Sequence, residues 1–402
     1  MMMSLTKVAP YFDIHVMSSD GWPVHCNLTV PNKLAIEAFA NFPKAALPEA
    51  GRAASGRGMT RAQAEASGLG EAIEIASLCR WGDELTLETD REDCPEPSWD
   101  AQTLMGFSNA QRRDRRAWND RLRGIDWIPD PKPVGPAEWV EARSIDGGSV
   151  WVPSQAVFMS HDLTVGSVAD CVADTNGCAA GSTDRAAQTH ALLELIERDA
   201  AGRWWYGARA RRLIGPDMLD EATTHTCTVL QNDGFAVKLI DITTDLGAPV
   251  VVAAGAHAGG KPIALGFGAA VTLVDAAQKA ACEMAQMLLV FQDPQGDSHR
   301  RPHLNAWMEE ASLETAPLGA ARFADGAEYS TSGSFLSRIR AAGVRLAFLE
   351  QTRPEFGVPV WRAISPDLCH WKPRFGRQRL LGLDPHDIGD CLQTPNPVLL
   401  PL

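Results

Sequence analysis

One pattern of residues occurs three times along the 402-residue chain and constrains its fold more than any other feature. Segments 60–74, 183–197 and 272–286 read TRAQAEASGLGEAIE, TDRAAQTHALLELIE and TLVDAAQKAACEMAQ. Each begins with threonine, has a small residue four and eight positions later, and then has a glutamate followed after three residues by an acid or amide. Threonine is a favourable helix N-cap, and Thr60 with Gln63 fits a capping box. The pattern predicts three helices that start at these threonines.

The acidic residues of each segment share a helical face with the small residues. Offsets of −7, −3, 0 and +3 from the first glutamate fall on one side of a helix with 3.6 residues per turn. For the second segment, one alternative is a solvated i,i+4 pair between Glu194 and Arg198, worth roughly 0.2–0.5 kcal/mol. Another is an alanine-rich scaffold with acids at its rim. The recurrence of the acids in one register favours a functional site over both.

Glycine-rich segments precede all three predicted helices, as SGRGMT, NGCAAGST and GFGAAVT. Glycines before a helix N-terminus let the backbone approach a phosphate, and the free N–H groups there favour anions. Five carboxylates and one amide brought to a common centre would repel each other without cations, and oxygen ligands select Mg²⁺ or Ca²⁺. Together the glycine loops and the acids predict a Mg-nucleotide site.

Charge and composition exclude several classes of partner. The net charge of −13 argues against nucleic acid, which is bound by clustered Lys and Arg. The chain shows neither a signal peptide nor an apolar run long enough to span a membrane, so we expect a cytoplasmic protein. Nine scattered cysteines without a C-x-x-C motif indicate reduced, mostly buried thiols. One basic run, QRRDRRAW at 111–118, is interpreted as a solvated helix face, with a patch for an acidic peptide as the alternative.

Strand-like and helical patterns alternate along the chain and predict an α+β fold, with a mixed sheet, packed helices and three similar glycine-loop and helix units around the nucleotide site. Residues 1–54 either extend the sheet or form a small subdomain. Residues 55–402 form the main domain, with an irregular excursion at about 85–140. The tail, with Pro395, Pro397 and Pro401, is expected to be extended and to add little to the core. It either has no function of its own or reaches into a site. Trp204 and Trp205 are expected to fill the core.

The run NGCAAGSTDRAAQTHALLELIERDA at 176–200, with WWY at 204–206, resembles the signature of the YcaO superfamily. The flanking copies resemble two other nucleotide motifs of that family, S-x3-E-x2-E at 67–74 and E-x2-Q at 283–286. SGRGMT, WGDE, GFSNAQ, DITTDLGAPV and the proline-bearing tail resemble its azoline-forming cyclodehydratase branch. The resemblance extends from about Ser55 to the C-terminus.

This resemblance implies an ATP- and Mg²⁺-dependent enzyme that acts on the backbone of a ribosomally made precursor peptide. A Cys, Ser or Thr side chain attacks the preceding amide carbonyl, ATP phosphorylates the resulting oxygen, and phosphate leaves to give an azoline. It also implies a separate E1-like protein that binds the leader peptide. A homodimer is left open. Two alternative functions are also left open: thioamide formation and a non-catalytic peptide-binding scaffold.

The resemblance also implies roles for individual residues. Arg198 would neutralise phosphate charge, Gln286 would assist the metal, and Pro401 would lie near the reacting centre. Arg57, Ser67 and Ser182 would lie near the nucleotide. The implied metal ligands are Glu71, Glu74, Glu194, Glu197 and Glu283.

The chain departs from the family pattern at several positions. Ser182 and Ala186 stand where the family commonly has Asn and Glu, and Ile75 replaces an Arg. Ala276 replaces a Ser and Val290 replaces a Gln. These departures predict the loss of one metal ligand, and they are the reason that the scaffold alternative is retained.

Overall fold

The structure is a computed structural model that combines helices with several β-sheets, and the predicted α+β class is confirmed. It describes residues 2–50, 53–122, 124–130, 135–159, 171–209, 211–257, 259–292, 302–315, 317–323, 334–381 and 396–400.

The strands of the described residues form three sheets rather than one, and neighbouring strands within each sheet run antiparallel. The first sheet has the order β1-β2-β3, with β1 at Phe12–Val16, β2 at His25–Pro31 and β3 at Ala54–Gly58. The second has the order β11-β10-β9-β8, with β8 at Arg212–Leu213, β9 at Phe235–Asp241, β10 at Val250–His257 and β11 at Ile263–Ala269.

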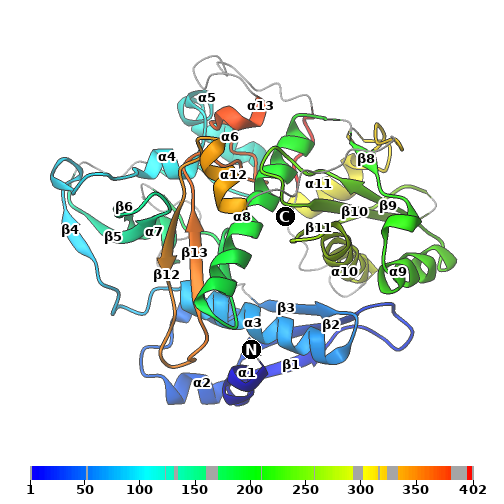
Figure 1. The fold of residues 1–402 in the computed structure, drawn as a ribbon, viewed down its shortest axis with the longest axis horizontal. Coiled ribbons are helices and arrows are strands. Elements are labelled where there is room, and N and C mark those ends of the chain that lie inside the picture. The colour runs from blue at the N-terminus through cyan, green and yellow to red at the C-terminus, as the bar shows by residue number, and fades with distance from the viewer. Residues whose placement is uncertain are drawn as a thin grey trace.

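The third sheet has the order β4-β5-β12-β13-β7, with β6 paired to β5. Its strands are β4 (Leu87–Thr89), β5 (Ala137–Ser144), β6 (Ser149–Pro153), β7 (Cys178–Ala180), β12 (Ala347–Glu350) and β13 (Val360–Ile364). In Figure 1 the first sheet lies at the bottom, the second at the right and the third at the left.

Strands β3, β7 and β11 each form an edge of their sheet, and each is followed by one of the predicted helices. These helices are α3 (Arg61–Leu78), α8 (Asp184–Tyr206) and α10 (Leu273–Gln292). Thr60 and Thr183 cap α3 and α8, and the Thr272 hydroxyl accepts the Asp275 N–H at the start of α10. The predicted helix starts are therefore correct, including the capping box of Thr60 and Gln63.

Glycines before these helices give room for close packing of a helix on its edge strand. Gly56 and Gly266 lie within strands β3 and β11, and the following helix packs directly on them. A Cβ at Gly56 would stand 2.1 Å from the Ala64 carbonyl oxygen, and one at Gly266 would stand 2.2 Å from the Met284 nitrogen. The missing side chain lets each helix lie close against its edge strand.

The remaining helices cover the sheets and fill the corners between them. Residues 1–54 supply two strands of the first sheet, so the N-terminal segment is joined to the unit that carries α3. The helices are α1 (Met2–Val8), α2 (Lys33–Ala38), α4 (Ala101–Met105), α5 (Asn109–Arg113), α6 (Arg115–Leu122), α7 (Ser154–Val157), α9 (Glu221–Asn232), α11 (Pro302–Glu310), α12 (Phe335–Ala341) and α13 (Gln378–Leu381). Among the described residues, no helix combines the length and the apolar character that crossing a membrane requires.

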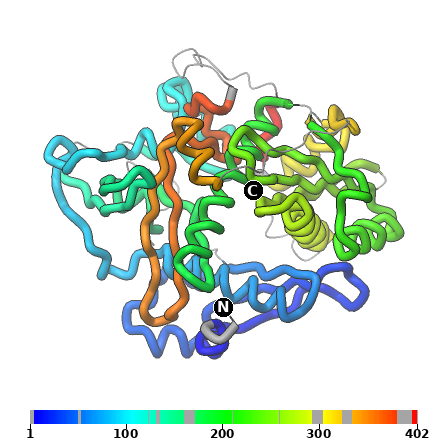
Figure 2. Tube along the Cα trace, in the orientation of Figure 1, coloured from blue at the N-terminus to red at the C-terminus, as the bar shows by residue number. Residues whose placement is uncertain are grey.

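The largest hydrophobic cluster surrounds α8, and Trp204 and Trp205 are fully buried in it, as predicted. The described part of the tail, 396–400, also packs there, which contradicts the expectation that the tail adds little to the core. Leu400 is 1% exposed, and the Val398 carbonyl accepts the indole N–H of Trp205 at 2.7 Å. Residues 396–400 therefore lie beside the C-terminal end of α8 (Figure 2).

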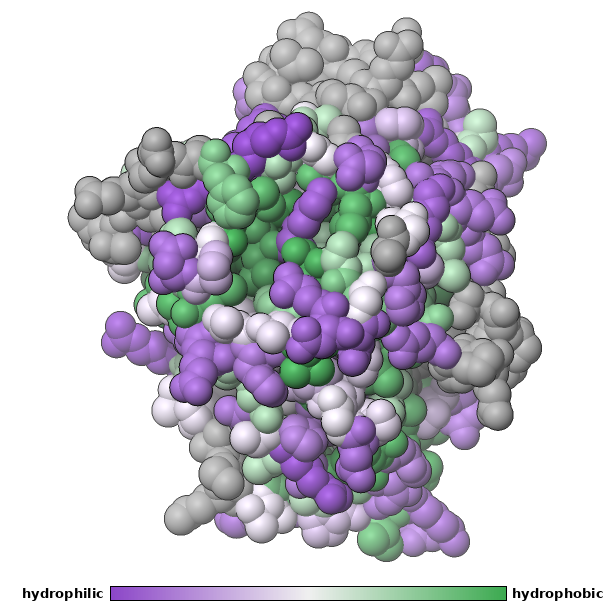
Figure 3. All heavy atoms as spheres, turned by 90° about the vertical axis from the view of Figure 1, so that its right-hand side faces the viewer, coloured by the Kyte–Doolittle hydropathy of each residue, from purple (hydrophilic) through white to green (hydrophobic). Residues whose placement is uncertain are grey.

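Outside the core the molecule is mainly hydrophilic on the face that Figure 1 shows at its right edge. Figure 3 turns this face to the viewer: charged and polar side chains cover most of it, and hydrophobic ones gather in its upper half.

Candidate nucleotide site

A cavity of about 760 Å³ lies between α3, α8 and α10, and the edge strands β3, β7 and β11 contribute to its walls. Most residues assigned to the site from the sequence line this cavity: Arg57, Ser67, Glu71, Glu74, Glu194, Glu197, Arg198, Glu283 and Gln286. Ser182 is exposed and is not among the lining residues. Pro401 lies outside the described residues. Of the substituted positions, Ile75 and Val290 line the cavity.

Four of the five glutamates bind backbone N–H groups of the edge strands. The Ser55 N–H donates to Glu71 at 3.1 Å, and the Phe267 N–H donates to Glu283 at 2.6 Å. In both pairs the glutamate belongs to the helix that follows the strand. Edge strands present unpaired N–H groups, and a buried N–H needs an acceptor. The first glutamate of α3 and of α10 supplies that acceptor.

The later acid of a helix reaches the edge strand of the next unit. Glu74 of α3 accepts the N–H of Ala180, at the end of β7, at 2.6 Å. Glu197 of α8 accepts the N–H of Ala269, at the end of β11, at 2.8 Å. Gln286 of α10 accepts from Arg57 of β3 at 3.4 Å. The three strand–helix units are therefore linked in a closed ring around the cavity by residues of the repeated pattern.

Arg57 of the first unit forms an ion pair with Glu283 of the third unit. Its Nη2 lies 3.4 Å from Glu283, and the nearby carboxylates outweigh its burial, so that its pKa is raised. Arg57 therefore stays cationic within the cavity wall. Lys279, on α10, adds a second cation and donates to the Ala269 carbonyl at 3.2 Å.

Arg198 is held by two glutamates and by an aromatic ring. Its guanidinium donates to Glu197 and, at 3.1 Å, to Glu194. Its Cζ lies 3.4 Å from the centre of the Trp371 ring, a stacked cation–π contact. Its buried Nε has no acceptor within the described part of the chain. A buried donor without an acceptor is costly, and an anion bound in the cavity would relieve that cost.

Four carboxylates of the cavity have raised pKa values because burial disfavours their charged form. Burial raises the pKa of Glu194 to about 7, with the nearby Glu197 adding to the shift and Arg198 opposing it. Burial also raises the pKa of Glu71 and Glu197, and raises that of Glu74 well above its ordinary value. A bound divalent cation would reverse this tendency, because it stabilises the ionised carboxylates.

The donor set fits a metal ion that is held together with phosphates. Among the described residues, no three His, Cys, Asp or Glu side chains stand close enough to form a metal site by themselves. Mg²⁺ in nucleotide sites is usually bound by one or two carboxylates, and phosphates and water complete its octahedron. Glutamates spread around a cavity wall with one oxygen on a backbone amide suit that arrangement.

A buried ionic network involves residues that flank Trp371 in the sequence. His370 Nε2 lies 3.1 Å from Asp174, and Arg374 binds Asp174 at 3.1 Å and Asp126 at 2.7 Å. Gln111, within the GFSNAQ segment, donates to the Pro373 carbonyl at 2.7 Å and accepts the Phe375 N–H at 2.9 Å. The segment thus fixes the loop that carries Trp371.

Among the cavity residues that sequence analysis did not assign are Lys279 and Trp371. Lys279 lies one turn before Glu283, so its i,i+4 spacing is a signal that was available. Trp371 stands in CHWKPRF, more than 170 residues from Arg198 in the sequence, and no motif marks it. His190 also lines the cavity, and its Nδ1 lies 3.0 Å from the Ala180 carbonyl oxygen.

Comparison with known proteins identifies the family of the chain. The family model described as YcaO cyclodehydratase, ATP- and Mg²⁺-binding, matches residues 55–369. The matched family is thus a class of proteins described as binding ATP and Mg²⁺. The chain belongs to the YcaO family.

Several solved structures share the fold. A heterocyclase in complex with substrate and cofactor has a TM-score of 0.83 and 23% identity, over 99% of this chain and 57% of that one. The heterocyclase TruD has a TM-score of 0.67 and 27% identity, over 79% of this chain and 47% of that one. YcaO from Methanopyrus kandleri, bound with AMPPCP and Mg²⁺, has a TM-score of 0.60 and 19% identity, over 91% and 90%. This chain spans about half the length of the two heterocyclases.

Proposed function

We propose that this protein is an ATP-dependent cyclodehydratase that forms azolines from Cys, Ser or Thr residues of a ribosomally made precursor peptide. The observation that carries the proposal is the ring of half-buried glutamates around one cavity, with Arg57 and Arg198 among them. Its similarity to heterocyclases, one of them solved with substrate and cofactor, supports the reaction class.

In this proposal Glu71, Glu74, Glu194, Glu197 and Glu283 hold Mg²⁺. ATP supplies the phosphoryl group that turns the amide oxygen into a leaving group. Arg198 neutralises phosphate charge through its free Nε–H, while Glu194, Glu197 and Trp371 fix the plane of its guanidinium. Arg57 and Lys279 balance part of the carboxylate charge in the absence of metal. Ser67 lies within the same cavity wall.

The reaction is tested by incubating the protein with the peptide encoded beside its gene, Mg-ATP and the E1-like partner, followed by mass measurement. Loss of one water per ring supports the proposal. Exchange of oxygen for sulfur, when a sulfur source is supplied, would indicate thioamide formation, and an unchanged mass would indicate a peptide-binding scaffold. Omitting the partner from a parallel reaction tests whether it is needed.

Nucleotide binding is tested separately from turnover. Calorimetric titration with AMPPCP should show tight binding in the presence of Mg²⁺ and much weaker binding with EDTA, because the glutamates repel phosphates without the metal. Equal affinity under both conditions would argue against metal-bridged phosphates.

A further inference from the structure

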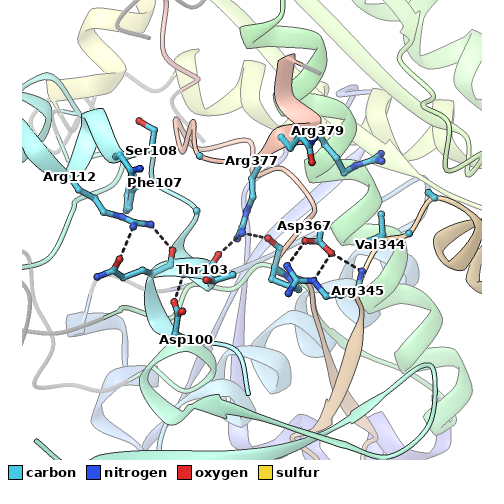
Figure 4. Close-up of a pocket in the computed structure, with 18 residues that line it drawn as sticks. Asp100, Thr103, Phe107, Ser108, Arg112, Val344, Arg345, Asp367, Arg377 and Arg379 are labelled. Atoms are coloured by element: carbon cyan, nitrogen blue, oxygen red, sulfur yellow. Dashed lines mark hydrogen bonds and ion pairs between the residues drawn. The ribbon is translucent and has the colours of Figure 1, made fainter. Parts of the chain in front are cut away.

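A second cavity, of about 580 Å³, lies outside the nucleotide site. Its walls come from α4, the start of α5, the turn at 342–345 and the segment 366–379, and Figure 4 looks into it. The volume falls within the roughly 300–1,000 Å³ of ligand sites in proteins. None of the residues assigned to the nucleotide lines this cavity. Segment 366–379 connects the two, because Trp371 lines the first cavity and Arg377 the second.

The second cavity is locally cationic on an acidic protein. The chain has a net charge of −13, yet arginines outnumber acids in this cavity. The charged lining residues are Arg112, Arg345, Arg377, Arg379, Asp100 and Asp367.

Two of the arginines and both aspartates are engaged in ion pairs. Arg345 binds Asp367 with two nitrogens, at 2.7 and 3.1 Å. Arg379 turns away from the cavity toward α8, where it binds Asp199 at 2.9 Å (Figure 4). Asp100 lies 2.7 Å from Arg91. Within the described part of the chain, neither Arg112 nor Arg377 forms an ion pair.

Arg377 is a buried cation without a carboxylate partner in the described part of the chain. It is 8% exposed, and it donates to the carbonyl oxygens of Thr103, Leu104 and Pro366. Gly106, with φ at +70°, makes room for it, since a Cβ there would lie 2.6 Å from the Arg377 Nε. Burial lowers the pKa of Arg377 to about 10. Carbonyl dipoles hold this guanidinium, and no carboxylate of the described residues forms an ion pair with it.

Arg112 lies across the cavity from Arg377 and is only partly buried (Figure 4). It donates through Nη1 to the Gln102 side-chain oxygen and through Nη2 to the Gln102 carbonyl oxygen, both at 2.8 Å. Two neutral oxygens thus accept from the pair of guanidinium N–H groups that ordinarily binds a carboxylate. The Gln102 side chain is exposed and can move aside for a charged acceptor.

We propose that this cavity binds carboxylate side chains of an acidic peptide segment, which displace the Gln102 amide from Arg112 and approach the charge of Arg377. This also assigns a role to Arg112, the first arginine of the basic run QRRDRRAW. The choice of a peptide as the source of the carboxylate rests on the proposed function. Binding of carboxylates to the cavity does not.

The test uses a fluorescein-labelled hexaglutamate peptide and the full chain without nucleotide, with binding followed by anisotropy at low salt. Hexaglutamine is the uncharged control peptide. Arg112→Gln should weaken hexaglutamate binding about tenfold or more, because a charge-assisted pair is lost. Arg113→Gln is the matched control: Arg113 is the next residue of α5, its side chain is 62% exposed, and it does not line the cavity. Its replacement should change the affinity by less than about twofold.

A second variant, Gln102→Glu, places a carboxylate of the chain itself beside Arg112 and should also weaken hexaglutamate binding. It removes no contact that the fold needs, so a loss of binding cannot be ascribed to unfolding. Equal binding by the wild type, Arg112→Gln and Gln102→Glu, or no binding of hexaglutamate at all, would overturn the proposal. Free glutarate that competes as well as the peptide, mole for mole, would overturn the assignment to a peptide. Because no turnover is measured, failure here is distinguishable from failure of the proposed function.

Discussion

At the scale of single residues, Glu194 and Glu197 show why acids occur on an otherwise apolar helix. Each lies on the face of α8 that lines the cavity, and burial raises the pKa of both. A surface ion pair with Arg198 would leave these pKa values near or below their ordinary range, because exposed carboxylates are well solvated.

We predict that replacing both glutamates by glutamine, in E194Q/E197Q, weakens Mg-nucleotide binding by at least about a hundredfold, since even outer-shell changes cost 10–100-fold. The metal-free protein should stay folded, because glutamine oxygens still accept from Arg198 and from the Ala269 N–H while the cost of two buried charges disappears. Calorimetry with Mg-AMPPCP and chemical unfolding on the same protein measure both effects.

The control for this double variant is Glu65→Gln, which removes an exposed acid of α3 that does not line the cavity. It should bind the nucleotide like the wild type. A double variant that binds Mg-nucleotide normally would contradict the assignment of α8 to the site.

His370 provides a pH-dependent test of the network behind Trp371. Burial lowers its pKa to about 4, with Arg374 and Lys372 adding to the effect and Asp174 opposing it. As the pH falls, His370 therefore binds a proton at a higher pH in the unfolded chain than in the folded chain. The associated stability is fully present above pH 6.5 and is lost as the pH falls toward 4, by up to about 3 kcal/mol.

This predicts that the free energy of unfolding of the wild type falls more steeply between pH 6.5 and 4 than that of His370→Gln, which cannot titrate. Urea unfolding of both proteins across this range measures the difference, and taking the difference removes the opposite contribution of Glu194. Parallel pH profiles would show that His370 does not titrate in this way.

At the scale of elements, the repeated pattern predicted the helices well and their connection to the strands poorly. Helix starts follow from local chemistry, and the structure has Thr60 and Thr183 as N-caps. The glycines were ambiguous, because a residue without a side chain suits a phosphate loop and a close helix–strand contact equally well. The tertiary structure shows the close helix–strand contact at Gly56, which lies against α3.

We therefore predict that Gly56→Ala lowers the free energy of unfolding by about 1–3 kcal/mol, because the new Cβ would overlap the Ala64 carbonyl and force α3 away from β3. The same shift lengthens the bond from the Ser55 N–H to Glu71, so nucleotide affinity should fall as well. Gly259→Ala is the control, since a Cβ there meets nothing within 4 Å, and its effect should stay within about 0.5 kcal/mol. Equal unfolding of the two variants would contradict the close packing of α3 on β3.

At the scale of the whole molecule, the sequence predicted features that follow from a recurring local pattern. It did not predict contacts between residues that lie far apart in the sequence. The glutamates of the cavity were found because they recur in register. The ring that links Glu74 to β7 and Glu197 to β11 was not predicted, since it depends on how three separate sheets meet. The same reason hid Trp371, whose partner Arg198 is adjacent only in the fold.

The C-terminal tail is the clearest case of this limit, since its prolines suggested an exposed segment while its described residues are packed on α8. Leu400 is buried, and the Val398 carbonyl accepts from Trp205. We predict that deleting residues 396–402 lowers the free energy of unfolding by about 2–4 kcal/mol, the combined cost of an emptied apolar site and an unpaired indole N–H.

Pro401→Ala separates a catalytic contribution of the tail from this structural one, because it leaves Val398 and Leu400 unchanged. If Pro401 lies near the reacting centre, as the family resemblance implies, the substituted protein should unfold like the wild type and bind Mg-AMPPCP normally, but modify the precursor peptide more slowly. Unfolding, nucleotide binding and peptide modification are measured on both tail variants. A deletion of 396–402 that unfolds like the wild type would contradict the packing of the tail, and full activity of Pro401→Ala would remove Pro401 from the mechanism.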